Sequence, residues 1–174
     1  MEDRSFSYEK WSEINATVKR DKIAILAVQE THLDDETTHS IQDMFRKRLT
    51  IINSQLERLP RTSAGVAFVL NKDLIDVKET RVVELIKGRA LALSATWNDQ
   101  ETTLINVYAP NRRQDHKNFW EKIEEQRQRT HTKKPDFVLG DFNIMEEAID
   151  RVPPRQDNFD VTLGPGVRLD LRFL

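Results

Sequence analysis

The sequence predicts an α/β domain. Segments with helical periodicity alternate along the chain with short segments rich in β-branched and aliphatic residues, and this alternation is typical of the α/β class. Several of the strand-type segments also end abruptly in polar residues, as strands do where α/β enzymes carry their functional groups. A length of 174 residues suits one domain.

The first part of the chain is predicted to alternate helix and strand. Residues 8–20 form the first helix, because their apolar positions recur on one helical face. The apolar run 23–28 predicts a strand that is covered on both faces of its sheet. Acidic residues at 34–36 then favour the start of a second helix, which reaches about residue 47.

The middle of the chain is predicted to consist of β-strands, because β-branched and aliphatic residues dominate it. These strands are expected near residues 50–53, 65–70, 77–85, 89–97 and 102–108. The polar stretch between the last two fits a hairpin turn.

The last predicted helix covers residues 115–130, and the apolar run 136–139 is a strand that leads to Asp141. Glycine and proline at 164–166 disfavour regular structure, and no clear periodicity follows them. The expected organisation is one domain at residues 1–157 and an irregular tail at 158–174.

Three predicted strands end in polar groups suited to phosphate chemistry. One ends at Glu30, one at Tyr108, and the last at Gly140-Asp141-Phe142-Asn143. Asp141 offers a hard anionic oxygen for Mg²⁺ or for orienting a water, and Asn143 can hydrogen-bond a phosphate oxygen without adding charge. Structural interpretations exist as well. The glycine motif fits a β-turn, Glu30 a surface acid, and Tyr108 a half-buried aromatic residue.

Taken together and in this order, three motifs resemble the endonuclease/exonuclease/phosphatase superfamily. They are Gln29-Glu30-Thr31-His32-Leu33, Asn106-Val107-Tyr108-Ala109-Pro110-Asn111 and Gly140-Asp141-Phe142-Asn143. The chain is most similar to the apurinic-type endonuclease domains of non-LTR (LINE-like) retrotransposons, in particular the fungal ones. The resemblance covers about residues 11–157 and implies a partial four-layer α/β sandwich.

The resemblance implies a role for each matched residue. Glu30 and Asp141 would hold the catalytic Mg²⁺, with Mn²⁺ as the alternative ion, and Asp141 would also orient or deprotonate the attacking water. Tyr108 would touch the scissile phosphate, and Asn143 would stabilise charge on the pentacovalent phosphate. Such groups suit phosphodiester hydrolysis, which needs a cation, an aligned hydroxide and donors aimed at the transition state.

Substrate-binding candidates follow the second motif. Asn111 would support the phosphate pocket, and Arg112 and Arg113 lie directly beside it. The net charge of −2 carries no general signal for nucleic acid, although DNA is the partner that the resemblance implies. Arg127 and Arg129 of the predicted third helix also fit an ordinary solvated helix face.

Two departures from the family pattern predict a weak or inactive enzyme. Family members open with a strand that ends in a metal-placing asparagine, whereas this sequence passes from its first residues directly into a helix. They also close with a serine-aspartate-histidine run, which is absent here; instead His32 fits a solvated loop and His116 the surface of a helix. The domain is therefore expected to be incomplete at both ends.

Composition favours an intracellular domain, either nuclear or cytoplasmic. Hydrophobic residues make up 38% and charged residues 32%, which supports a modest core. No apolar run reaches the roughly 18 residues of a membrane span, and the N-terminus has no signal-peptide pattern. Because the chain has no cysteine, oxygen ligands and a hard cation are favoured over thiolate sites.

The sequence thus predicts metal-dependent hydrolysis of DNA phosphodiesters by an impaired, retrotransposon-derived endonuclease domain. Two alternatives stay open: a non-catalytic remnant that at most binds nucleic acid, and a phosphatase of the same superfamily. The enzyme hypothesis requires Glu30, Tyr108 and Asp141 to converge with Asn111 and Asn143. Exposed apolar surface is also expected, because segments for a complete second sheet are missing.

Overall fold

The computed structural model describes residues 4–56, 64–97 and 100–143. The chain separates into two compact units, 1–142 and 143–174, and every element named here belongs to the first. In chain order these elements are α1 (Arg4–Arg20), β1 (Ile25–Gln29), α2 (Asp35–Phe45), β2 (Leu49–Ser54), β3 (Val66–Asn71), the 3₁₀ turn η1 (Val77–Glu79), β4 (Arg81–Ile86), β5 (Ala90–Trp97), β6 (Gln100–Tyr108), α3 (Arg113–Arg129) and β7 (Phe137–Asp141).

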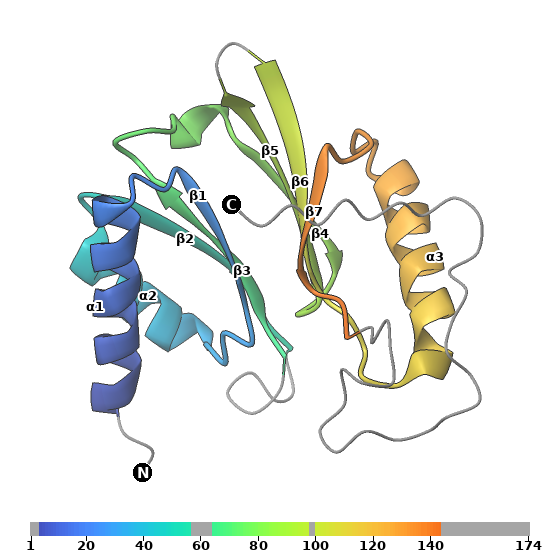
Figure 1. Cartoon of the computed structure of the whole chain (residues 1–174), viewed down its shortest axis with the longest axis horizontal. Coiled ribbons are helices and arrows are strands. Elements are labelled where there is room, and N and C mark those ends of the chain that lie inside the picture. Colours follow the sequence, from blue (N-terminus) through green and yellow to red (C-terminus); the bar gives the residue numbers. More distant parts are fainter. Residues whose placement is uncertain (1–3, 57–63, 98–99, 144–174) are drawn as a thin grey trace. The chain divides into compact units, whose positions relative to one another are not determined.

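The first unit has four layers (Figure 1). Strands β1, β3 and β2 form an antiparallel sheet in that order, and α1 and α2 pack on its outer face. Strands β4, β5, β6 and β7 form the second sheet, with α3 on its outer face. All of its pairs are antiparallel except β6 with β7, which is parallel. The predicted α/β sandwich is confirmed.

A core fills each of the three spaces between layers, and the alternation of side chains along the strands explains why. On β3, Phe68 and Leu70 face the second sheet, where they pack with Leu93, while Val69 faces the helices. On β5, Ala92 faces α3. Small residues on that face let the helix approach closely. The two sheets therefore share one apolar layer, and it is this layer that the site borders.

The predicted elements are present with three differences that matter. The strand predicted from residue 77 begins as η1, because the Asp76 side chain caps this turn by accepting from the Lys78 N–H at 2.9 Å. The strand predicted at 136–139 continues to Asp141, so this carboxylate stands at the end of β7 and not on the turn beyond it. The first helix begins at Arg4, before its predicted start.

Strand β1 is covered on both faces, as predicted, but it lies at the edge of its sheet and is half-buried throughout. The strands of the predicted hairpin do pair, from Trp97 with Gln100 onward, although the turn residues lie outside the described part. The predicted domain boundary at 157 lies outside it too.

Among the helices that the structure describes, none combines the length and the apolar content needed to cross a membrane.

Apolar side chains are exposed on β7, as expected for an uncovered sheet face. Phe137 and Leu139 are the register partners of Leu104 and Asn106 on β6, whose side chains face the first sheet. Residues that pair side by side point to the same face. Phe137 and Leu139 therefore also point to the inner face, yet both side chains stay exposed beside β1.

Candidate active site

Glu30, Tyr108 and Asp141 lie together at one edge of the sandwich. Tyr108 ends β6, Asp141 ends β7, and the two are register partners in the parallel pair. Glu30 follows β1 of the other sheet, and its Oε1 accepts a hydrogen bond of 2.5 Å from the Tyr108 hydroxyl. Three predicted residues from three separate segments thus converge.

Gly140 makes the pairing of β7 with β6 achievable. Its φ is +131°, and a Cβ at this position would lie 2.0 Å from the carbonyl oxygen of Val107. Only glycine lets β7 approach β6 this closely. The sequence predicts Gly140 in a turn, but in the structure Gly140 lies within β7. There it allows the close pairing with β6 that places Asp141 beside Tyr108.

The main chain around Asp141 is held from two sides. Its carbonyl accepts a hydrogen bond of 2.8 Å from the Ala109 N–H of the neighbouring segment. The next residue, Phe142, stacks on Trp120 of α3 with 5.9 Å between the ring centroids. The carboxylate itself is exposed. Asp141 thus combines a fixed backbone with an accessible side chain.

The turn after β1 orients Glu30. Its φ is +50°, in the left-handed region, and this bends the chain out of the strand. The next residue, Thr31, is buried and donates through its hydroxyl to Asn53 Oδ1 at 2.8 Å. The Thr31 N–H also bonds the carbonyl of Gly65 at 3.3 Å. These contacts hold an uncommon backbone conformation at a predicted site residue.

The surroundings of Tyr108 change the acidity of its phenol. The hydrogen bond to Glu30 raises the pKa of Tyr108 above its ordinary value, and burial and the negative charges of Glu30 and Asp141 act in the same direction. The Arg89 guanidinium lowers the pKa and only partly offsets this rise. The phenol therefore stays protonated and able to donate at neutral pH.

Arg89 is a site neighbour that sequence reasoning missed. Its guanidinium lies 5.4 Å from the centroid of the Tyr108 ring and donates to the Tyr108 carbonyl at 3.2 Å. Its own carbonyl accepts from the Tyr108 N–H at 2.8 Å, which makes the two residues cross-strand neighbours. No local pattern marks Arg89, because only the pairing of β5 with β6 brings it to this edge.

Gln29 and Asn106 belong to the first two motifs and have a structural role beside the site. The Gln29 side-chain amide donates to Asn106 Oδ1 at 2.6 Å, so the two residues join β1 to β6 directly behind the site. A signal existed in the sequence. Asn106 interrupts an apolar strand at a position whose neighbours of the same parity, Leu104 and Tyr108, face the other sheet.

The predicted substrate-binding residues lie on the connection from β6 to α3. Asn111 and Arg112 are exposed, and in the described part of the chain neither bonds Glu30, Tyr108 or Asp141. Arg112 precedes α3 without a capping bond from its side chain, and Arg113 is its first helical residue. Asn143 begins the second unit, so the structure does not assign it to this edge.

Two further expectations concern His116 and Arg127. His116 was expected at the surface; its ring is half-buried, and its Nε2 lies 2.6 Å from the carbonyl oxygen of Pro110. It fastens the connection that follows Tyr108. Arg127 bonds Glu124 and the carbonyl of Thr132, which supports its interpretation as part of an ordinary helix face. His32 is exposed, as expected.

The donor set at this edge suits a hard cation that keeps most of its water ligands. Glu30 and Asp141 are exposed carboxylates, and the charges of both act on the same phenol. Within the described residues, no group of three or more histidine, cysteine or acidic side chains gathers as a metal cage. Two carboxylates and several waters are a common arrangement for Mg²⁺.

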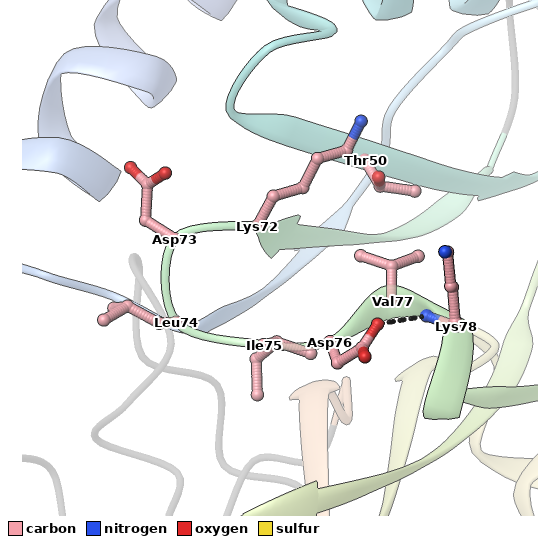
Figure 2. Close-up of a pocket in the computed structure, with 8 residues that line it drawn as sticks. All are labelled: Thr50, Lys72, Asp73, Leu74, Ile75, Asp76, Val77 and Lys78. Atoms are coloured by element: carbon pink, nitrogen blue, oxygen red, sulfur yellow. Dashed lines mark hydrogen bonds between the residues drawn. The ribbon is translucent and has the colours of Figure 1, made fainter.

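A separate cleft of about 540 Å³ lies where β3 ends, away from Glu30 (Figure 2). It is lined by Thr50 and residues 72–78. Its polar groups bond locally: Asp76 accepts from the Lys78 N–H, and Lys72 Nζ donates to the Arg46 carbonyl at 2.7 Å. None of the predicted site residues lines it, so the strand edge and not this cleft is the candidate site.

Comparison with known proteins adds family and fold. A family model described as "Endonuclease/Exonuclease/phosphatase family" matches residues 12–172. The chain is 28% identical over 137 residues to the "Transposon TX1 uncharacterized 149 kDa protein" of Xenopus laevis, a match that covers 78% of this chain and 10% of that protein.

Among the solved structures of similar fold are two endonucleases. AP endonuclease LMAP from Leishmania major has a TM-score of 0.59 and 17% identity, covering 81% of this chain and 54% of that one. The endonuclease domain of TRAS1, a telomere-specific non-LTR retrotransposon, has a TM-score of 0.51 and 15% identity, with coverage of 77% and 53%. The chain thus spans about half of each structure and a tenth of the transposon protein.

Proposed function

Because the chain belongs to the endonuclease/exonuclease/phosphatase family, we propose that Glu30, Tyr108 and Asp141 serve metal-dependent hydrolysis of a DNA phosphodiester. The observation that carries this proposal is the hydrogen bond from the Tyr108 hydroxyl to Glu30, with Asp141 at the register position beside Tyr108. DNA as the substrate is supported by the transposon relative and by the two endonucleases of similar fold.

Each side chain has a chemical task in this proposal. Glu30 and Asp141 would hold Mg²⁺ or Mn²⁺, which would offset charge on the non-bridging phosphate oxygens. A carboxylate oxygen of Asp141 would orient the attacking water and accept its proton. The Tyr108 hydroxyl has one hydrogen, so it would leave Glu30 and donate to a phosphate oxygen when the carboxylate is engaged elsewhere.

Residues outside this trio would serve the substrate. Asn143 would stabilise charge on the pentacovalent phosphate, Asn111 would support the pocket, and Arg112 and Arg113 would contact flanking phosphates. The rate should be low, because the 174 residues contain no serine-aspartate-histidine run to supply a further donor to the phosphate.

The test is nicking of supercoiled plasmid, and of a duplex with one abasic site, in Mg²⁺ or Mn²⁺. Asp141→Ala should lower the rate about 10²- to 10⁴-fold, the usual cost of losing a general acid or base. Asp43→Ala, which removes an exposed carboxylate of α2, should leave it unchanged. Equal background from the native chain and Asp141→Ala would refute the proposal and favour the non-catalytic alternative. A phosphomonoester assayed in parallel separates an endonuclease from a phosphatase.

A further inference from the structure

Asn106 is a polar residue inside the apolar layer between the two sheets. It is fully buried on β6, between Leu104 and Tyr108 on the inner face. A buried amide is costly unless its donors and its acceptor are bonded. Its partners in this layer therefore show what the residue does.

All three hydrogen bonds of the Asn106 amide cross to the other sheet. Its Nδ2 donates to the carbonyl oxygens of Val28 at 3.0 Å and Ala67 at 2.9 Å, and these two residues are register partners in the β1–β3 pair. Its Oδ1 accepts from Gln29 Nε2 at 2.6 Å. One side chain thus fastens β6 to both β1 and β3.

The partners of Asn106 adjoin the candidate site. Val28 and Gln29 directly precede Glu30, and Asn106 is two residues before Tyr108 on the same face of β6. From the second sheet, Asn106 bonds Val28 and Gln29 of β1, and Tyr108 bonds Glu30, the residue after it. The ladder with β3 and the Thr31 contacts hold the end of β1 within its own sheet, and these bonds tie that end to the second sheet, which carries Tyr108.

We propose that Asn106 is a positioning residue, whose amide holds the end of β1 against β6 in the arrangement that brings Glu30 to Tyr108. The clamp is a property of the fold, whereas its importance for catalysis rests on the proposed function. If Asn106 only stabilised the core, replacing it would lower the stability of the fold but would leave the hydrogen bond between Glu30 and Tyr108 intact. The two roles therefore differ in a measurable way.

A double-mutant cycle in urea unfolding separates them, because coupled groups give non-additive effects. In the native background, Tyr108→Phe removes the hydrogen bond to Glu30 and should lower the folding equilibrium constant about 3- to 10-fold. In an Asn106→Leu background the same change should lower it less than about 2-fold, since the bond is already lost. An equal loss in both backgrounds would overturn the proposal.

Asn71→Leu is the matched control. Asn71 is also buried, and its Nδ2 donates to the Ile23 carbonyl at 3.2 Å, near the start of β1 and far from Glu30. Asn71→Leu should destabilise the fold, but in this background Tyr108→Phe should lower the folding equilibrium constant as much as it does in the native chain.

If Asn106→Leu does not fold, Gln29→Leu takes its place, because it removes only the bond to Asn106 Oδ1. Gln29→Leu should at least halve the effect of Tyr108→Phe, and an unchanged effect would refute the clamp.

Nicking kinetics form the second arm. Asn106→Leu should lower kcat at least about 10-fold while KM for DNA stays within about 3-fold, because misplaced catalytic groups weaken the transition state more than the substrate complex. Asn71→Leu should leave both constants unchanged. A native chain that nicks no DNA would refute the proposed function, and the unfolding cycle would still decide whether Asn106 positions Glu30. A kcat equal to the native value would overturn the positioning role.

Discussion

Strands β6 and β7 are parallel neighbours in one sheet, yet their inner faces differ. On β6, Leu104 and Asn106 are 8% and 0% exposed because the three-stranded sheet lies over them. On β7, their register partners Phe137 and Leu139 are 59% and 37% exposed. The same face of the same sheet is thus a sealed core at one strand and open surface at the next.

The candidate site lies on this boundary. Tyr108 belongs to the covered strand, where Glu30 and the Asn106 clamp hold it in place. Asp141 belongs to the uncovered strand and is fixed through its main chain and Phe142. The Tyr108 side chain is thus held by contacts from the other sheet, whereas the Asp141 carboxylate is exposed on a fixed main chain.

The largest expected effect comes from the covered side. Phe68 is fully buried on β3 between the sheets, so Phe68→Ala should lower the free energy of unfolding by about 3–5 kcal/mol. Urea denaturation measures this loss. A cost below about 1 kcal/mol would mean that the layer between the sheets is loosely packed.

The junction of the two strands comes next. Gly140→Ala would place a Cβ 2.0 Å from the Val107 carbonyl oxygen at a φ of +131°, and we expect a loss of about 2–4 kcal/mol. The neighbouring exposed change Leu139→Ala should cost less than about 1 kcal/mol. Comparable unfolding midpoints for the two variants would show that β7 does not need its close approach to β6.

A smaller and pH-dependent effect is expected at Tyr108. Its pKa is raised on folding, so its contribution to stability is fully present below the ordinary value of 10.0 and is lost as the pH rises through the higher folded value. Tyr108→Phe should therefore be less stable than the native chain at pH 7–9, by about 1 kcal/mol, and the difference should shrink above about pH 10.

The pH series has an internal control. In a Glu30→Gln background the hydrogen bond loses its charged acceptor, so Tyr108→Phe should cost less stability at pH 7–9 than it does in the native chain, and this cost should vary less with pH. A difference that grows with pH in the native background would contradict the direction of the Tyr108 pKa.

The smallest effect is expected on the open strand. Phe137→Ser should change the free energy of unfolding by no more than about 0.5 kcal/mol, because the side chain is largely exposed already. It should nevertheless reduce binding of a hydrophobic dye, since it removes exposed apolar surface. A strong destabilisation would reveal that Phe137 is covered in solution, and the contrast between β6 and β7 would then disappear.

Local patterns in the sequence were sufficient for most of the elements, whereas the candidate site residues also needed the family resemblance. Apolar spacing separates helices from strands because it reflects contacts within a few residues, so the α/β class followed from it. Glu30, Tyr108 and Asp141 each end an apolar strand, but this pattern also fits structural roles, and only the resemblance favoured a site; the structure brings the three residues together. Some bounds shifted through a local contact, such as the Asp76 cap before β4, and others through tertiary pairing, such as the extension of β7 to Asp141 beside β6.

Tertiary structure alone decided how these segments meet. Glu30 and Tyr108 are 78 residues apart, and their contact depends on the packing of two sheets whose strand order no local pattern encodes. For the same reason Arg89 became visible as a neighbour of Tyr108 only once β5 was paired with β6. Asn106 depends both on a local sequence pattern and on tertiary structure. Its polarity within an apolar strand is written in the sequence, whereas its partners belong to strands that only the folded chain places within hydrogen-bonding distance.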